Sequence, residues 1–146
     1  MGTRRKAREL GLQILFQVDV GEIPLDDTFK NFWRVDKVSP EIRDFAAHIC
    51  KGVVGNLKEV DSIVKKYTKN WEIGRINNID RNILRIAIYE LLFCRDVPYK
   101  VVINEAIEIG KKYGTLESGK FINGVLDGVA KERRSKEHAV GSKQKE

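Results

Sequence analysis

The sequence predicts an all-α protein, with six to seven helices packed in one bundle-like domain. Apolar residues recur every three or four positions along the chain, which is the period of an amphipathic helix. The strict alternation of apolar and polar residues that is typical of half-buried strands does not occur. Pro24, Pro40 and Pro98 each stand at the edge of a periodic segment, where helices begin or end. A length of 146 residues is that of a single domain.

Four helices are expected in the first half of the chain, over residues 3–20, 27–35, 40–54 and 57–67. Thr3 is the expected N-cap of the first, and Gly21 ends it. Ser39 followed by Pro40 is typical of a capped helix start, so the third helix is expected to begin there.

The second half is expected to hold a short helical turn at 71–76 and three longer helices, over residues 78–93, 98–113 and 117–134. Asn78 or Asp80 is the expected cap of the first of these, and its apolar residues cover both sides. Such a helix is expected to be surrounded by others. Periodicity ends after Arg134, which predicts a domain over residues 1–134 and a basic flexible tail over residues 135–146.

The net positive charge of the chain comes from its two ends. The net charge is +6, residues 1–10 hold four basic residues and one acid, and residues 131–146 hold six basic residues and three acids. The segment between them is neutral. Basic ends indicate either contact with a polyanion, most often nucleic acid, or termini that only keep the protein soluble. The sequence leaves both interpretations open at this point.

Composition and hydropathy exclude several classes of protein. No apolar run approaches the roughly 18 residues of a membrane span, and no secretory signal follows the N-terminal basic residues. Cys50 and Cys94 lie far apart without a pairing pattern, as reduced and buried thiols do. We therefore expect a soluble cytoplasmic protein that makes no contact with a membrane.

The first helix carries residues for two different faces. Ala7, Gly11, Ile14, Leu15 and Val18 gather on one side, which is the expected core face. Leu12 and Phe16 fall roughly opposite, on a face shared with Arg5, Arg8, Glu9 and Gln13. An outward aromatic ring among cations suits unpaired nucleic-acid bases and suits a protein partner equally. A third interpretation is that the helix is packed on two sides and Phe16 is simply buried.

A second candidate surface lies before and within the start of the last helix. It contains Lys111, Lys112, Tyr113, Lys120, Phe121 and Asn123. Backbone amides at a helix start, with lysines beside them, attract phosphate. A solvated loop with incidental lysines is the alternative interpretation.

Enzymatic interpretations find no support in the sequence. The glycines near position 52 lack the Gly-Lys-Ser/Thr that completes a phosphate-binding loop. His48 is expected to be a packed helical residue, and no Cys, His and carboxylate cluster has the spacing of metal ligands. We therefore expect no catalytic residues, no metal and no cofactor.

Several motifs together resemble one known family. They are RRKARE at 4–9, LQILFQ at 12–17, DRNILRIA at 80–87, YEL at 89–91, VP at 97–98, VINEAIE at 102–108 and KFINGVLD at 120–127. In this order and combination they resemble the NusB family of bacterial transcription antitermination factors. The family is shared with the RNA-binding domain of some ribosomal RNA methyltransferases. The large cofactor-binding domain of those enzymes does not fit in the remaining residues, so methyl transfer is not expected.

The resemblance implies both a fold and a function. It implies two small helical subdomains packed at a steep angle, in a protein that binds the single-stranded boxA element of ribosomal RNA leaders. It also implies a partner, the ribosomal protein NusE, which tightens RNA binding, and a complex that keeps RNA polymerase elongating through terminators.

The family's motifs place RNA contacts on named positions of this chain. RNA contacts are expected at Arg4, Arg5, Lys6, Arg8, Gln13, Phe16, Lys120, Phe121 and Asn123. Lys111 and Lys112 of the second candidate surface are added to this set. NusE contacts are expected at Phe16, Asp80 and Glu105. Phe16 therefore serves either partner.

The chain departs from the family pattern at two positions and in its basic tail after Arg134, which matches nothing in that pattern. Phe16 replaces a tyrosine of many relatives, which removes a hydroxyl and keeps the ring, and Gly110 replaces an alanine, which permits closer helix packing. Two other classes of function stay open: a helical protein–protein interaction module without specific RNA binding, and a binder of double-stranded DNA. Whether the chain is a monomer also stays open, since a homodimer could cover the Phe16 face in the absence of partners.

Overall fold

The computed structural model describes residues 2–35, 37–68 and 72–145, with side chains as far as Ser135. Over these ranges the chain is helical and contains no strand, which confirms the all-α prediction. The elements are α1 (Thr3–Val20), α2 (Leu25–Val35), α3 (Pro40–Gly55), α4 (Leu57–Tyr67), the 3₁₀ helix η1 (Ile73–Arg75), α5 (Asn78–Phe93), α6 (Tyr99–Tyr113) and α7 (Ser118–Lys145).

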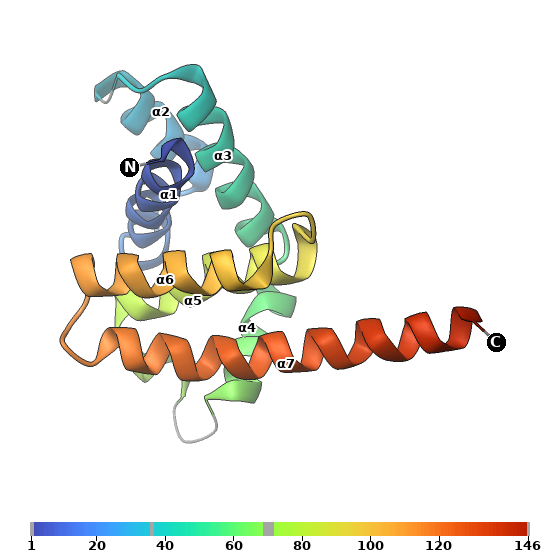
Figure 1. The fold of residues 1–146 in the computed structure, drawn as a ribbon. Helices are drawn as coiled ribbons and strands as arrows, with labels where there is room; N and C mark the ends of the chain where they lie inside the picture. The colour runs from blue at the N-terminus through green and yellow to red at the C-terminus, as the bar shows by residue number, and fades with distance from the viewer. Residues whose placement is uncertain (1, 36, 69–71, 146) are drawn as a thin grey trace.

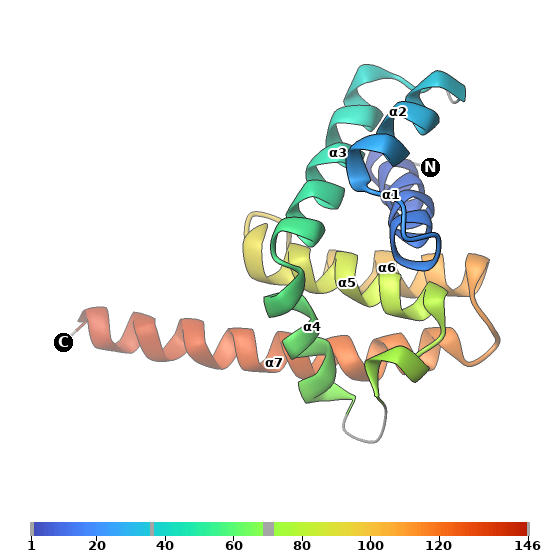
Figure 2. The same ribbon diagram turned by 180° about the vertical axis from the view of Figure 1, so that it is seen from behind.

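The helices form two groups that cross steeply, as the resemblance implied. In Figure 1, α5, α6 and α7 run side by side, while α1 and α3 rise away from them with α2 at the far side. Figure 2 shows α4 leading from the end of α3 into the α5–α7 group. α1 packs against both α3 and α5. The N-terminal residues of α1 therefore lie where the two groups meet.

α5 is the central helix of the fold. Every residue from 80 to 91 is buried, because α1, α3, α4, α6 and α7 all pack against it. This confirms the expectation from its two apolar sides. Its predicted cap was wrong: Asn77 is the N-cap, since its Oδ1 accepts the Asp80 amide at 2.8 Å and its Nδ2 donates to Asp80 Oδ2 at 3.1 Å. Each of these two residues therefore hydrogen-bonds the other at the start of α5.

Other helix boundaries follow local signals. Ser39 caps α3 by accepting the Ile42 amide at 3.3 Å, as predicted. At α1 the N-cap is Gly2, and Thr3 is the first helical residue. α2 begins two residues before the predicted start, and Thr28 donates both its amide and its hydroxyl to the Pro24 carbonyl. Trp71, at the start of the predicted 71–76 turn, lies outside the described residues, and η1 occupies the middle of that segment.

The expectation that helical structure ends near Arg134 was wrong. The backbone of α7 stays helical as far as Lys145, and Figure 1 shows this end of the helix extending beyond the rest of the molecule. Charged and polar residues in this segment, such as lysine, glutamate and glutamine, are good helix formers. Loss of an apolar stripe after Arg134 therefore did not end the helix.

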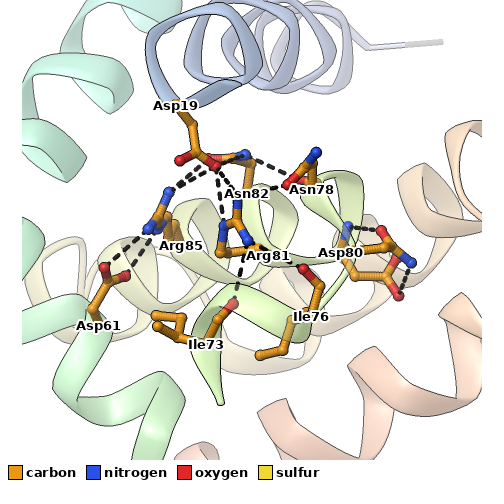
Figure 3. A network of polar contacts seen from close by, with 10 residues as sticks. Asp19, Asp61, Ile73, Ile76, Asn78, Asp80, Arg81, Asn82 and Arg85 are labelled. Atoms are coloured by element: carbon orange, nitrogen blue, oxygen red, sulfur yellow. Dashed lines mark hydrogen bonds and ion pairs between the residues drawn. The ribbon is translucent and has the colours of Figure 1, made fainter. Parts of the chain in front are cut away.

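A network of polar side chains joins α1, α4 and α5 (Figure 3). Asp19 Oδ2 accepts hydrogen bonds from Arg81 Nε at 3.0 Å, Arg81 Nη2 at 2.6 Å and Asn82 Nδ2 at 3.0 Å. Arg85 Nη1 lies 3.3 Å from the same oxygen, and Arg85 also forms a two-bond ion pair with Asp61 of α4. Both guanidinium groups are at most 10% exposed. The network thus joins the C-terminal end of α1 to the α5–α7 group.

Close helix contacts depend on small residues. The Cys50 thiol lies 3.6 Å from the Gly11 carbonyl oxygen, and burial there raises the pKa of Cys50 to about 12. This thiol is therefore buried and protonated, as expected, whereas Cys94 is only partly buried. At Gly110 a Cβ would lie 2.7 Å from Ile122 Cδ1, so the glycine does permit the closer approach of α6 and α7 that its sequence predicted.

Gly52→Ala is expected to destabilise the fold by about 1–3 kcal/mol, the usual cost of overpacking a core. The added Cβ would lie 2.1 Å from Tyr89 Cζ. That ring is buried and stacked on Phe93 at 5.3 Å between centroids, so it cannot easily move aside. Chemical denaturation measures the change. Gly124→Ala is the matched control, because nothing lies within 4 Å of its Cβ and the helix gains up to about 1 kcal/mol. Equal stability of the Gly52→Ala variant and the wild type would contradict this packing.

Candidate nucleic-acid interface

The first turn of α1 presents three cations in different environments. Arg4 is exposed, and its guanidinium lies 3.9 Å from the centre of the Phe45 ring of α3. Lys6 is exposed as well. Arg5 is half-buried, with its Nε 2.5 Å from Glu105 Oε2 of α6. The hydrogen bond that Arg5 donates to Glu105 raises the pKa of Arg5 above its ordinary value.

Arg8 is not on the outward face that the sequence predicted. It is 4% exposed, and its Nε and Nη2 donate to the carboxylate of Glu90 at 2.7–3.2 Å. Glu90 is also buried, at the end of α5 nearest this part of α1. The guanidinium lies 5.7 Å from the Phe45 ring. Arg8 therefore holds α1 to α5 and is not accessible to an RNA in this conformation.

The outward face of α1 is narrower than its helical wheel predicted. Leu12 was expected on that face and is only 2% exposed, because α1 is covered by α3 on one side and α5 on the other. Gln13 is exposed, as expected. Phe16 is half-buried, so its ring is neither fully outward nor fully enclosed between helices.

Glu9 occupies the centre of the predicted RNA surface. It is 7% exposed, and its Oε1 accepts a hydrogen bond from Lys112 Nζ at 2.7 Å. This hydrogen bond, which Lys112 donates to Glu9, raises the pKa of Lys112. Glu9 thus joins α1 to the C-terminal end of α6, and it fixes the position of one of the predicted RNA-binding lysines.

Two grooves lie on either side of Glu9. The first, which we call the Arg5 groove, has a volume of about 240 Å³ and is lined by Arg5, Glu9, Glu108, Ile109, Lys111 and Lys112. The second, the Tyr113 groove, has a volume of about 320 Å³ and is lined by Lys6, Glu9, Leu10, Gln13, Lys37, Val38 and Tyr113. Together the grooves connect the start of α1 with the end of α6 and with the α2–α3 connection.

The first turn of α7 lies beside the end of α6. Lys120 and Asn123 are exposed, and Phe121 is half-buried and packs against the edge of the core. A Cβ on Gly119 would lie 3.6 Å from the Lys111 side chain, which places Lys111 next to this turn. The fold therefore brings the two predicted RNA surfaces together, with Lys111 and Lys112 between α1 and α7.

The two acidic residues predicted to bind NusE differ in accessibility. Asp80 is 5% exposed and is hydrogen-bonded to the N-cap residue Asn77, so the expectation that it lies on a surface was wrong. Glu105 is half-buried and paired with Arg5. Glu105 of the predicted NusE surface therefore contacts Arg5 of the predicted RNA surface.

Sequence reasoning missed three residues of this region. Lys37 stands in a connection between helices and carries no motif, and Tyr113 was noted only as part of a basic segment. Glu9 was expected as one of several polar residues on α1, and nothing in the sequence indicated its bond to Lys112, 103 positions away. Such pairings depend on the crossing of the helices and leave no local signal.

The fold and this surface define an all-α protein with cations from three separate segments on one side. The chain belongs to the NusB family, since the sequence model of that family matches residues 5–131. It is 46% identical over 129 residues to the transcription antitermination protein NusB of Desulfatibacillum aliphaticivorans, covering 88% of this chain and 90% of that relative. It is 48% identical to the protein of the same name from Anaeromyxobacter dehalogenans strain 2CP-1, covering 87% and 89%. These relatives are transcription factors, in agreement with the prediction that the chain is not an enzyme.

Solved structures have the same fold. NusB of T. maritima superposes with a TM-score of 0.81 at 39% identity, covering 88% of this chain and 91% of that one. A crystal structure of the antitermination factors NusB and NusE in complex with dsRNA gives a TM-score of 0.82 at 27% identity, covering 90% and 98%. Among the described helices of the present chain, none is long and apolar enough to cross a membrane.

Proposed function

We propose that this protein is a cytoplasmic transcription antitermination factor that binds boxA RNA together with NusE. In this role it joins the complex that keeps RNA polymerase elongating through ribosomal RNA operons. Membership of the NusB family over residues 5–131 is the observation that carries the proposal. The crystallised relative that was solved with NusE and dsRNA supports both partners. The basic surface formed by α1, α6 and α7 supplies a place for RNA.

The proposed RNA contacts divide by chemistry. Cations neutralise phosphates, which gives affinity that depends on salt, and aromatic rings or amides stack on and read unpaired bases. We assign phosphate contacts to the accessible cations of the surface, Arg4, Arg5, Lys6, Lys111, Lys112 and Lys120. Base contacts are assigned to Gln13, Phe16, Phe121 and Asn123. Arg8 leaves this set because it is buried against Glu90.

The proposed NusE surface adjoins the RNA surface through one ion pair. We assign Glu105 and Phe16 to NusE and remove Asp80, which is buried. Glu105 pairs with Arg5 at 2.5 Å, so a partner that engages Glu105 competes with this ion pair. RNA and NusE would then favour each other's binding, and any such coupling is reciprocal.

Fluorescence anisotropy with labelled boxA RNA and a scrambled RNA, with and without NusE and across salt, tests the proposal. The wild type is expected to prefer boxA, and NusE is expected to strengthen that preference. Lys120→Gln is expected to weaken binding and to reduce the salt slope by about 0.7, the value for one phosphate on a single strand.

Lys58→Gln is the matched control for the loss of one positive charge. Lys58 is exposed in α4, beyond the C-terminal end of α3, whereas Lys37 and the Tyr113 groove lie at the other end. The control is expected to change neither affinity nor slope. Equal binding of boxA and scrambled RNA in the presence of NusE would contradict the proposal. It would favour a protein-interaction module whose cations serve solubility.

A further inference from the structure

The Tyr113 groove is not explained by the contacts assigned above. Leu10 and Val38 line it with apolar side chains, and Tyr113 lines it with an aromatic ring. Lys6 and Lys37 also line it, and both are exposed. An aromatic ring, two apolar side chains and two cations together match the parts of one nucleotide, whose base is flat and apolar on its faces and whose phosphate is anionic.

The size of the groove suits a single nucleotide. Its volume of about 320 Å³ lies at the lower end of the roughly 300–1,000 Å³ of small-molecule sites. Bases in a duplex are stacked on their neighbours and paired, so only an unpaired base can enter such a groove. The groove therefore fits single-stranded RNA better than a duplex.

The groove also continues the proposed RNA surface. Glu9 lines both this groove and the Arg5 groove, and its partner Lys112 lies 5.2 Å from the centre of the Tyr113 ring. Lys112 Nζ donates a hydrogen bond to Glu9 at 2.7 Å, and this bond fixes the side chain that the two grooves share. A strand that crosses Lys111 and Lys112 from α7 would next meet Tyr113.

We propose that the Tyr113 groove binds one unpaired nucleotide of the RNA, with the base against the Tyr113 ring and a phosphate between Lys6 and Lys37. This inference rests on the proposed function and extends it to two residues outside the family motifs, Tyr113 and Lys37. Gln13 borders the groove and is exposed, so its amide is placed to hydrogen-bond an edge of the same base.

A scan of boxA RNAs, each with one abasic position, tests the groove. With the wild type bound to NusE, one position is expected to lose affinity by roughly 5- to 100-fold when its base is removed, the usual contribution of a stacked base. In Tyr113→Leu the intact RNA is expected to bind that much more weakly, and removal of the same base is expected to cost almost nothing more. This non-additivity identifies the nucleotide that contacts Tyr113.

Three further variants separate stacking from folding and from charge. Tyr113→Phe keeps the ring and is expected to bind as the wild type does. Phe93→Leu is the control, since Phe93 is an exposed aromatic near the other end of α6 and is expected to have no effect on RNA affinity. Lys37→Gln is expected to reduce the salt slope by about 0.7 without altering the abasic profile.

The outcomes distinguish this inference from the proposed function. If the wild type prefers boxA but no abasic position is coupled to Tyr113, the proposed nucleotide site is overturned and the proposed function stands. A Tyr113→Phe variant as weak as Tyr113→Leu, with both folded by circular dichroism, would also overturn stacking. If the wild type with NusE binds no single-stranded RNA, both proposals fail together.

Discussion

Glu90→Gln is expected to lower the free energy of unfolding by about 3–5 kcal/mol, the cost of breaking a buried ion pair by removing one partner. Glu90 is 1% exposed and its carboxylate accepts three hydrogen bonds from the guanidinium of Arg8. The glutamine keeps the shape of the side chain but leaves the Arg8 charge buried without a counter-charge. Urea denaturation at neutral pH measures the loss.

A double variant separates the cost of an uncompensated charge from the value of the pair. Arg8→Met combined with Glu90→Leu removes both charges and retains apolar volume, and such replacements are often neutral or stabilising. The double variant is therefore expected to be several kcal/mol more stable than Glu90→Gln. Additive losses in Arg8→Met, Glu90→Leu and the double variant would show that the two side chains do not depend on each other.

The same double variant tests the structural role of Arg8 against its predicted RNA contact. If Arg8 only holds α1 to α5, the folded double variant keeps the boxA affinity and salt slope of the wild type. A steep loss of RNA binding in a folded protein would restore Arg8 to the RNA surface.

Helix positions were predictable because their signals are local. Ser39 and Pro40 start α3 by their own geometry, and Gly21 ends α1. The burial of α5 on all sides could also be predicted, since apolar residues cover two of its sides. Each of these features needs only residues within a few turns of one another. The family motifs also predicted the fold of nearly the whole chain.

Which residues lie on the surface was less predictable, because their burial depends on which helices cover each side of α1. A helical wheel places Leu12 opposite the core face, and only the fold reveals that both faces of α1 are covered. Arg8 and Glu90 are 82 positions apart, so neither residue carries a sign of the other. Basic residues at a chain end indicate positive potential, but burial decides which of them remain accessible.

The Asp19 network controls a second large part of the stability. Burial raises the pKa of Asp19, but the hydrogen bonds from Arg81 and Asn82 and the charges of Arg85 and Arg81 lower it by more, so its net pKa is lowered. A carboxyl whose folded pKa lies below its unfolded value stabilises the fold when it is ionised. This contribution is fully present above the unfolded pKa of about 4 and is lost as the pH falls through the folded pKa.

Asp19→Asn is therefore expected to cost about 2–4 kcal/mol at neutral pH, because it leaves Arg81 and Arg85 nearly buried with Asp61 as the remaining carboxylate of this network. The stability difference from the wild type is expected to shrink as the pH falls below about 4, where Asp19 itself becomes protonated. Urea denaturation across pH measures this difference. Asp127→Asn is the control: its ion pair with Lys131 is exposed, and its loss is expected to cost less than about 1 kcal/mol. A difference that stays constant from neutral to acid pH would show that the Asp19 charge does not join the two groups of helices.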